Sequence, residues 1–262
     1  MPAQTTRTAI SSFVPISPAS RPGAFCVAAA LWVCVLVFSA APASAKTDAE
    51  WFGAVKASIG EVTIDSISTR GIGTGATIGG IVDGSLEDDE VDDYTAGLGF
   101  AFGRRFGYWQ IEGEYVWRYR TDWDIVAATP SIQTITNIFS NVETNSLLLN
   151  LTRRGPINEH WSWEMGAGIG WVTNDIESDY VEREVPGIRP ELKVSDDDST
   201  SDFSYNVFGG VTRELGGPWT LNLRMRYIDL GELETGPFPS RAARASADHT
   251  SIEMMFTLER DF

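Results

Sequence analysis

The stretch "WTLNLRMRYIDL", Trp219 to Leu230, alternates between two kinds of side chain as far as Tyr227. One set of positions is apolar: Trp219, Leu221, Leu223, Met225 and Tyr227. The set between them is polar: Thr220, Asn222, Arg224 and Arg226. A period of two predicts a β-strand with one apolar face and one polar face. The fold therefore depends on what lies against each face.

Seven further stretches alternate in the same way, and no amphipathic helix longer than a turn or two is evident. The eight predicted strands cover residues 51–60, 94–103, 108–122, 141–152, 161–172, 203–214, 219–230 and 250–262. Short links that contain Gly or Pro cover residues 104–107, 153–160 and 215–218, and long links cover residues 61–93, 123–140, 173–202 and 231–249. An even number of strands with alternating short and long connections is the layout of an outer-membrane β-barrel.

The two faces of these strands distinguish a membrane barrel from a secreted soluble barrel or sandwich. The polar face is rich in glycine, which weakens an exposed strand but fits the crowded interior of a narrow barrel: Gly97, Gly99, Gly166, Gly168, Gly170 and Gly210. Aromatic residues gather at the strand ends and form two rings. One ring is Trp51, Trp109, Trp161 and Trp219; the other is Tyr94, Trp117, Tyr119, Trp171, Phe203, Tyr205 and Tyr227. Two aromatic belts are typical of the two membrane interfaces, so we expect an all-β, eight-stranded antiparallel up-and-down transmembrane β-barrel.

The inward face of such a barrel carries charges of both signs. The nine predicted inner residues are Lys56, Glu112, Glu114, Arg118, Glu164, Arg224, Arg226, Glu253 and Glu259. Unpaired ions in a narrow, low-dielectric tube are costly, so these side chains should pair and hydrogen-bond. The pattern favours a salt-bridged plug, and a narrow ion pathway is the alternative.

The N-terminal region predicts export. Arg21 precedes the apolar stretch "AFCVAAALWVCVLVFSAAPASA", residues 24–45, which ends in the small-residue cleavage site Ala43-Ser44-Ala45. This pattern is typical of a secretory signal peptide cleaved after Ala45, here with a long segment before the apolar core; a transmembrane anchor is the alternative. We therefore expect residues 1–45 to be the signal peptide and residues 46–262 to be the outer-membrane barrel domain.

Cleavage at that site leaves a strongly acidic chain without cysteine. Both cysteines, Cys26 and Cys34, lie within the predicted signal peptide. The full chain has a formal net charge of −16, and removal of Arg7 and Arg21 leaves 18 basic against 36 acidic residues, or −18. This sign argues against nucleic-acid binding, and the lack of cysteine excludes disulfide stabilisation of the mature chain.

Two long links are especially acidic: "DGSLEDDEVDD" at residues 83–93 and "SDDDSTSD" at residues 195–202. Carboxylates with Ser and Thr are suitable ligands for Ca²⁺ or Mg²⁺, but neither run has the spacing of a calcium loop. The simpler interpretation is a pair of solvated charge runs, so no metal site and no cofactor are predicted.

In this architecture the chain resembles the small eight-stranded outer-membrane barrel superfamily. This group includes the barrel of outer-membrane protein A, the opacity-type adhesins, and the surface antigens or "porin family" proteins of alphaproteobacteria. The stretch "RYIDLGELETG", residues 226–236, resembles the penultimate strand of these proteins. The terminal Phe262 resembles the signal that the outer-membrane assembly machinery reads, although Arg260 stands where the family usually has an apolar or aromatic residue. The resemblance covers the whole mature chain as architecture.

Some small barrels in outer membranes are lipid A deacylases, whose nucleophile site resembles a His-x-Ser pair on a strand. Two such pairs occur here, His160/Ser162 and His249/Ser251, and neither serine is followed by the asparagine of that family. The first pair lies beside a short link, which we expect on the periplasmic side, away from lipid A in the outer leaflet. The second pair has odd residue numbers, like the inward-facing Glu253 and Glu259 of the same strand, so it should face the lumen. We therefore expect no catalytic residues.

The sequence thus predicts a monomeric integral protein of the cell outer membrane of a Gram-negative bacterium. Expected partners are outer-membrane lipid, lipopolysaccharide and the assembly machinery, with the acidic links facing outward. The favoured function is a structural or surface-interaction role through those extracellular segments. A small porin-like channel is the alternative, and a lipid A-modifying enzyme is a more distant one.

Overall fold

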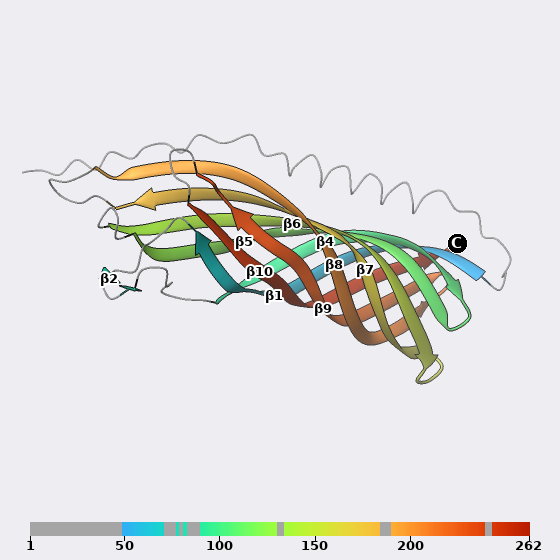
Figure 1. The fold of residues 1–262 in the computed structure, drawn as a ribbon. Helices are drawn as coiled ribbons and strands as arrows, with labels where there is room; N and C mark the ends of the chain where they lie inside the picture. The colour runs from blue at the N-terminus through green and yellow to red at the C-terminus, as the bar shows by residue number, and fades with distance from the viewer. Residues whose placement is uncertain are drawn as a thin grey trace, which may run out of the picture.

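The computed structural model describes residues 49–70, 77–78, 81–82, 90–129, 134–183, 190–238 and 243–262. The predicted signal peptide with Ala45, and most of the acidic run at residues 83–93, lie outside the described residues. Eight long strands form a closed ring (Figure 1): β1 Ala49–Arg70, β4 Val91–Phe106, β5 Trp109–Thr129, β6 Thr134–Pro156, β7 Trp161–Glu182, β8 Leu192–Gly216, β9 Trp219–Thr235 and β10 Arg244–Asp261. Two short strands, β2 Thr77–Ile78 and β3 Ile81–Val82, pair with each other.

The predicted up-and-down antiparallel barrel is confirmed. Each long strand pairs with the next long strand along the chain, and β10 closes against β1 over a register from Phe52–Asp261 to Arg70–Arg244. All eight predicted strands coincide with these elements, except that Tyr108 and Phe262 each lie one residue outside. Among the described residues, the structure contains no helix that is long and apolar enough to cross a membrane.

At the end of the barrel where the chain terminates, the connections between strands are short, as the sequence predicts (Figure 1). Gly107 and Tyr108 join β4 to β5, and Gly217 and Pro218 join β8 to β9. Gly107 and Gly217 have φ of 57° and 62°, the left-handed region that glycine enters without steric cost. Four residues, 157–160, join β6 to β7.

The prediction that the long links are loops is wrong, because most of their described residues belong to strands. The strands run well past the outer aromatic ring and form an extension of the barrel, residues 61–70, 91–93, 120–129, 134–143, 173–182, 192–202, 229–235 and 244–250. Of the two acidic runs, residues 195–202 lie within β8, whereas residues 83–89 of the other run lie outside the described residues. Between the two rings of aromatic residues the outward side chains are exposed and apolar, as Leu98, Leu149 and Ile169 are. This is the surface predicted to face lipid, and we refer to it as the lipid-facing part of the barrel.

The extension is not a continuous barrel but two facing sheets. Pairing of β4 with β5 stops at Gly97–Arg118, and pairing of β8 with β9 stops at Asn206–Ile228. Above these points β9, β10, β1 and β4 form one sheet, whereas β5, β6, β7 and β8 form the other. Side chains bridge both seams. Between β8 and the end of β9, Glu232 N donates to Asp202 Oδ2 at 3.0 Å and Gly236 N donates to Asp198 Oδ2 at 2.7 Å; between β4 and β5, Asp122 N donates to Asp93 Oδ2 at 2.9 Å.

An apolar core fills the space between these sheets. Its buried residues are Val62, Ile64, Trp123, Ile125, Ile138, Val142, Ile176, Tyr180, Leu233, Phe238, Ala243, Ala245 and Ala247. On β5 an irregular register between Arg118 and Thr121 shifts the inward positions from even to odd numbers. On β9 a second irregularity at Gly231, whose φ is 79°, has the same effect. Such β-bulges turn a strand over without ending it, so a strict period of two fails at these points.

Candidate functional site

The interior of the lipid-facing part contains a network of buried charges. All nine residues predicted from strand parity face the lumen, and their relative exposure is at most 3 %. The strands β1, β5, β7, β9 and β10 supply them, because alternation places every second side chain inside. The structure therefore brings together every charged residue that the sequence placed on the inner face.

The middle of the network is built on two neighbouring glutamates of β5. Lys56 Nζ contacts both carboxylates and lies 2.8 Å from Glu112 Oε1. Arg224 Nη1 donates to the same Oε1 at 2.8 Å, and Arg226 donates to Glu114. Each of these two carboxylates thus has two cationic partners, which is the arrangement that a buried carboxylate needs.

The same pattern continues toward the extension. Arg226 also binds Glu253 through Nε at 3.1 Å and Nη2 at 2.5 Å. Arg118 Nε donates to the other oxygen of Glu253 at 2.5 Å, and Arg118 Nη1 donates to Ser146 Oγ at 2.9 Å. Glu253 is therefore shared by two guanidinium groups.

Toward the short turns, two arginines that the sequence analysis assigned to links complete the network. Arg154 binds Glu259 Oε1 at 2.8 Å and Glu164 Oε2 at 3.1 Å. Arg105 binds Glu259 and Asp261. The alternation of inward and outward positions places both side chains inside, because Arg105 continues the inward positions of β4 and Arg154 continues those of β6. Neither was predicted, because the expected strands end at Gly103 and Thr152 and the observed strands continue to Phe106 and Pro156.

The complete charge network is balanced. Its six cations are Lys56, Arg105, Arg118, Arg154, Arg224 and Arg226, and its six carboxylates are Glu112, Glu114, Glu164, Glu253, Glu259 and Asp261. Neutral amides supply further donors: Asn150 Nδ2 lies 3.3 Å from Glu112 and 3.2 Å from Glu114, and Asn222 Nδ2 lies 2.5 Å from Glu259. The network is therefore a connected set of ion pairs rather than a row of isolated charges.

Glycine makes room for the bulky groups of this interior. A Cβ atom on Gly166 would overlap the ring of Phe208, which itself packs against the Arg224 guanidinium with the Cζ atom 4.8 Å from the ring centroid. A Cβ atom on Gly168 would overlap the side chain of Asn150. The glycines of the polar face thus fit the crowded lumen, as the sequence analysis proposed.

Apolar side chains occupy the lumen beyond the charges. Leu148, Val172, Ile228 and Leu230 form a small buried cluster near the outer aromatic ring. The apolar core of the extension follows it along the same strands. A path along the barrel axis therefore leaves the charged region and meets packed apolar side chains, with small buried polar groups such as Thr144 and Asn174 beside them.

His249 lies where the charge network meets the apolar core, beyond the lipid-facing segment of β10 that runs from Ile252 to Arg260. It is 1 % exposed, and neither ring nitrogen has a hydrogen-bond partner among the described residues. Burial lowers the pKa of His249 from 6.5 to about 3, and the nearby Arg118 acts in the same direction. His249 does not activate Ser251, whose Oγ donates instead to the backbone oxygen of Glu61 at 2.8 Å.

The acidic run at residues 195–202 was predicted to be a loop, and the structure places it within β8. Its side chains alternate between the two faces and bind neighbouring strands: Ser195 Oγ donates to Asp179 at 2.6 Å, and Ser199 Oγ donates to Asp175 at 2.8 Å. Within the part of the chain that the structure describes, no group of three or more His, Cys, Asp or Glu residues is placed to hold a metal ion.

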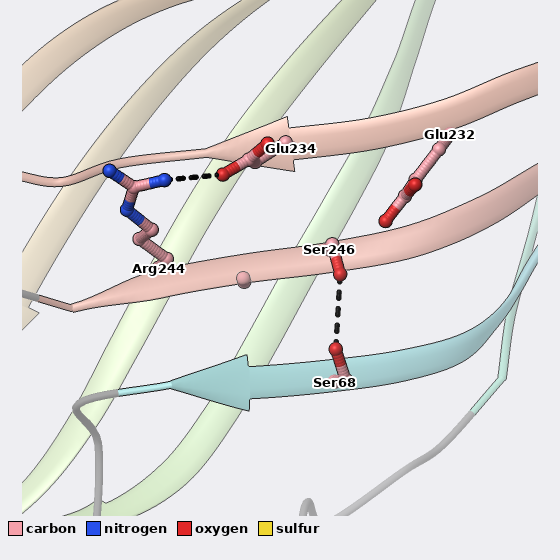
Figure 2. Close-up of a pocket in the computed structure, with 6 residues that line it drawn as sticks. Ser68, Glu232, Glu234, Arg244 and Ser246 are labelled. Atoms are coloured by element: carbon pink, nitrogen blue, oxygen red, sulfur yellow. Dashed lines mark hydrogen bonds and ion pairs between the residues drawn. The ribbon is translucent and has the colours of Figure 1, made fainter.

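A shallow pocket of about 210 Å³ lies on the outer face of the extension, over β1, β9 and β10 (Figure 2). Arg244 Nη1 donates to Glu234 Oε1 at 2.8 Å on one side of it. The hydroxyl groups of Ser68 and Ser246 lie 3.0 Å apart on the other side, and Glu232 lies farther along β9, to the right of both pairs in the view. The pocket is polar and carries one more carboxylate than cations.

The sequence matches the family described as "Outer membrane protein beta-barrel domain" over residues 30–252. The chain belongs to this family. It is accordingly an integral β-barrel protein of the outer membrane, as predicted. A search of curated proteins gives no match.

Solved barrels of the outer membrane are similar to this family member in fold. Neisserial surface protein A (NspA) is 10 % identical, with a TM-score of 0.38, covering 84 % of this chain and 100 % of its own. OprG from Pseudomonas aeruginosa is 16 % identical, with a TM-score of 0.39, and the coverage is 80 % and 96 %. Ail, the attachment invasion locus protein of Yersinia pestis, was solved in complex with the heparin analogue sucrose octasulfate; it is 12 % identical, with a TM-score of 0.36 and coverage of 80 % and 99 %.

Proposed function

We propose that this outer-membrane protein is a closed barrel that acts through its extracellular surface and does not conduct ions. The observation that carries the proposal is the filled lumen. Six cations and six carboxylates pair across it, and apolar side chains occupy the next level toward the outside. An ion would have to displace several charge-assisted hydrogen bonds and then pass between packed, largely apolar side chains, where an unpaired ion is strongly disfavoured.

Single-channel recording of the refolded protein in planar bilayers tests this proposal. We expect no steady conductance for the native chain. A steady conductance that disappears when the lumen is filled near Arg224, for instance by Gly210→Leu, would establish the small pore instead. Gly209→Leu is a matched control, because Gly209 faces outward and the atom nearest to an added Cβ is 3.8 Å away.

The extension is the surface through which we expect the protein to act. Its outer face carries the carboxylates of Asp175, Glu177, Asp179 and Asp197, together with the pocket of Glu232 and Glu234. An acidic surface attracts cationic or hydroxyl-rich partners and repels polyanions. A sulfated ligand of the kind bound to Ail is therefore not what this surface favours.

Binding to proteoliposomes separates these chemistries. We expect a polylysine probe to bind the native chain at low salt and heparin not to bind. The double variant Glu232→Gln/Glu234→Gln should weaken polylysine binding, whereas Glu50→Gln, at the opposite end of the barrel, should not. Equal binding of heparin and polylysine would contradict the proposed surface role.

The proposal includes maturation and assembly. Residues 1–45 are removed on export after Ala45, the remaining chain inserts as a monomer among phospholipid and lipopolysaccharide, and Phe262 is read by the assembly machinery. The mass of the protein purified from outer membranes tests the cleavage site. We propose no catalytic role, because His249 and Ser251 do not form a hydrogen-bonded pair.

A further inference from the structure

The outer surface at the short-turn end carries a pattern that repeats four times around the barrel. Each tryptophan of this ring faces an arginine of the neighbouring strand in register: Trp51–Arg104, Trp109–Arg153, Trp161–Arg213 and Trp219–Arg260. In each pair the Arg Cζ atom lies over the indole ring, at 5.3, 5.6, 5.3 and 5.6 Å from the ring centroid. Arg260, which departs from the family pattern, is thus one member of a set of four.

These arginines differ from their neighbours in the sequence. Arg105 and Arg154 point inward and pair with carboxylates of the charge network. Arg104, Arg153 and Arg213 point outward, and among the described residues they form no ion pair. Their positive charge is held against the ring faces by cation–π contact, and it is left available to a group outside the protein.

The position of this ring defines the environment of these guanidinium groups. The short turns of outer-membrane barrels face the periplasm, and the aromatic belt at that end lies at the level of the lipid headgroups. A phosphate is the anion present at this level, and a guanidinium binds phosphate through two parallel hydrogen bonds.

One of the four pairs adjoins a hollow in the lipid-facing wall. A pocket of about 300 Å³ lies over β1, β4 and β5, and its lining includes Trp51, Phe102, Phe106 and Gly113, with Arg104 as its charged residue. Gly113 faces outward, and a Cβ atom there would meet only the backbone oxygen of Phe102 at 3.9 Å. The missing side chain leaves an apolar recess below a guanidinium group, which matches the acyl chain and the phosphate of a lipid.

We propose that this recess binds an anionic phospholipid of the periplasmic leaflet, with the phosphate on Arg104 and an acyl chain over Gly113. The outward-facing Arg153 and Arg213 contact phosphates in the same way without a recess. The ring thereby fixes the depth of the barrel in the membrane at its periplasmic side. This inference does not depend on the proposed surface role, because it concerns the opposite end of the molecule.

Native mass spectrometry of the refolded protein in detergent tests the proposal, with dimyristoylphosphatidylglycerol as the anionic probe and dimyristoylphosphatidylcholine as the neutral one. We expect the native chain to retain phosphatidylglycerol in preference to phosphatidylcholine. Arg104→Gln removes a charge-assisted contact and should reduce this retention about tenfold or more. Arg104→Lys keeps the charge and should lose less.

Two glycine variants separate the recess from general lipid adhesion. Gly113→Leu fills the recess and should reduce retention of phosphatidylglycerol, whereas Gly209→Leu, on the lipid-facing surface outside this pocket, should leave it unchanged. Heat-modifiable migration on a gel verifies that each variant is folded. Equal retention of the two lipids by the native chain, or native retention in both Arg104→Gln and Gly113→Leu, would overturn the proposal.

Discussion

Removal of one cation from the lumen should destabilise the barrel strongly, and removal of a matching carboxylate should reverse much of the loss. Arg226 is 1 % exposed and binds Glu114 and Glu253. Arg226→Met leaves the buried network with one negative charge in excess, and such a change costs about 3–5 kcal/mol. The remaining partners, Lys56 for Glu114 and Arg118 for Glu253, do not neutralise it, because the network is balanced only as a whole.

The double variant Arg226→Met/Glu114→Gln is neutral again and keeps the pairs Lys56–Glu112 and Arg118–Glu253. We therefore expect it to be more stable than Arg226→Met alone by about 2 kcal/mol, a coupling typical of residues in one buried network. The assay is equilibrium unfolding in urea in phospholipid vesicles, followed by tryptophan fluorescence and by migration of unboiled samples. If Glu114→Gln adds its own cost to that of Arg226→Met within about 0.5 kcal/mol, the buried charges are not coupled and the reasoning is wrong.

The exposed pair Arg120–Glu177 is a matched control for this experiment. Its Nη2–Oε2 distance is 2.6 Å, but the two side chains are 43 % and 60 % exposed. Because solvent screens such a pair, Arg120→Met should cost no more than about 1 kcal/mol.

Three further predictions concern packing and pH. Trp123→Ala empties part of the apolar core of the extension and should cost about 3–5 kcal/mol; limited proteolysis of the folded protein should then cut the extension while the lipid-facing part stays protected, and an unchanged digest would contradict this core. Gly166→Ala forces the Phe208 ring to move and should cost about 1–3 kcal/mol, whereas Gly209→Ala should change the free energy of unfolding by less than about 0.5 kcal/mol. His249 stays neutral in the folded state down to a pKa of about 3, whereas in the unfolded chain it gains a proton below 6.5. Stability should therefore fall as the pH drops below 6.5, by up to about 1.4 kcal/mol per pH unit, and a native chain whose pH dependence equals that of His249→Leu would refute this.

The lipid-facing half of the fold was predictable from sequence because a membrane imposes two strict conditions on it. Apolar residues must face lipid and polar residues must face a narrow lumen, so strands such as β9 alternate without exception from Trp219 to Tyr227. The nine inner charges follow from the same parity. The ion-pair partners do not follow from this alternation, because ion pairs across the lumen join strands that are not neighbours. An example is the pair of Arg224 on β9 with Glu112 on β5.

The extension was not predictable as strand. In water the polarity of the two faces is reversed: on β7, Ile176 and Tyr180 face inward while Asp175 and Glu177 face outward. An acidic outer face looks like a solvated loop, and the bulges on β5 and β9 break the period of two. The Trp–Arg pairs depend on register, which strand patterns alone do not fix.

With the extension facing outward, as we propose, the length of β7 sets how far the protein reaches from the cell. The eleven residues from Val172 to Glu182 continue beyond Trp171 of the outer belt. At about 3.3 Å per residue and a tilt near 40°, they rise about 25–30 Å above the lipid. This height is similar to the thickness of the hydrocarbon layer below it, so the tips of the strands stand clear of the headgroups. A large partner can therefore meet the protein before it meets the membrane, and a variant with shortened hairpins would lose that reach while its barrel stayed intact.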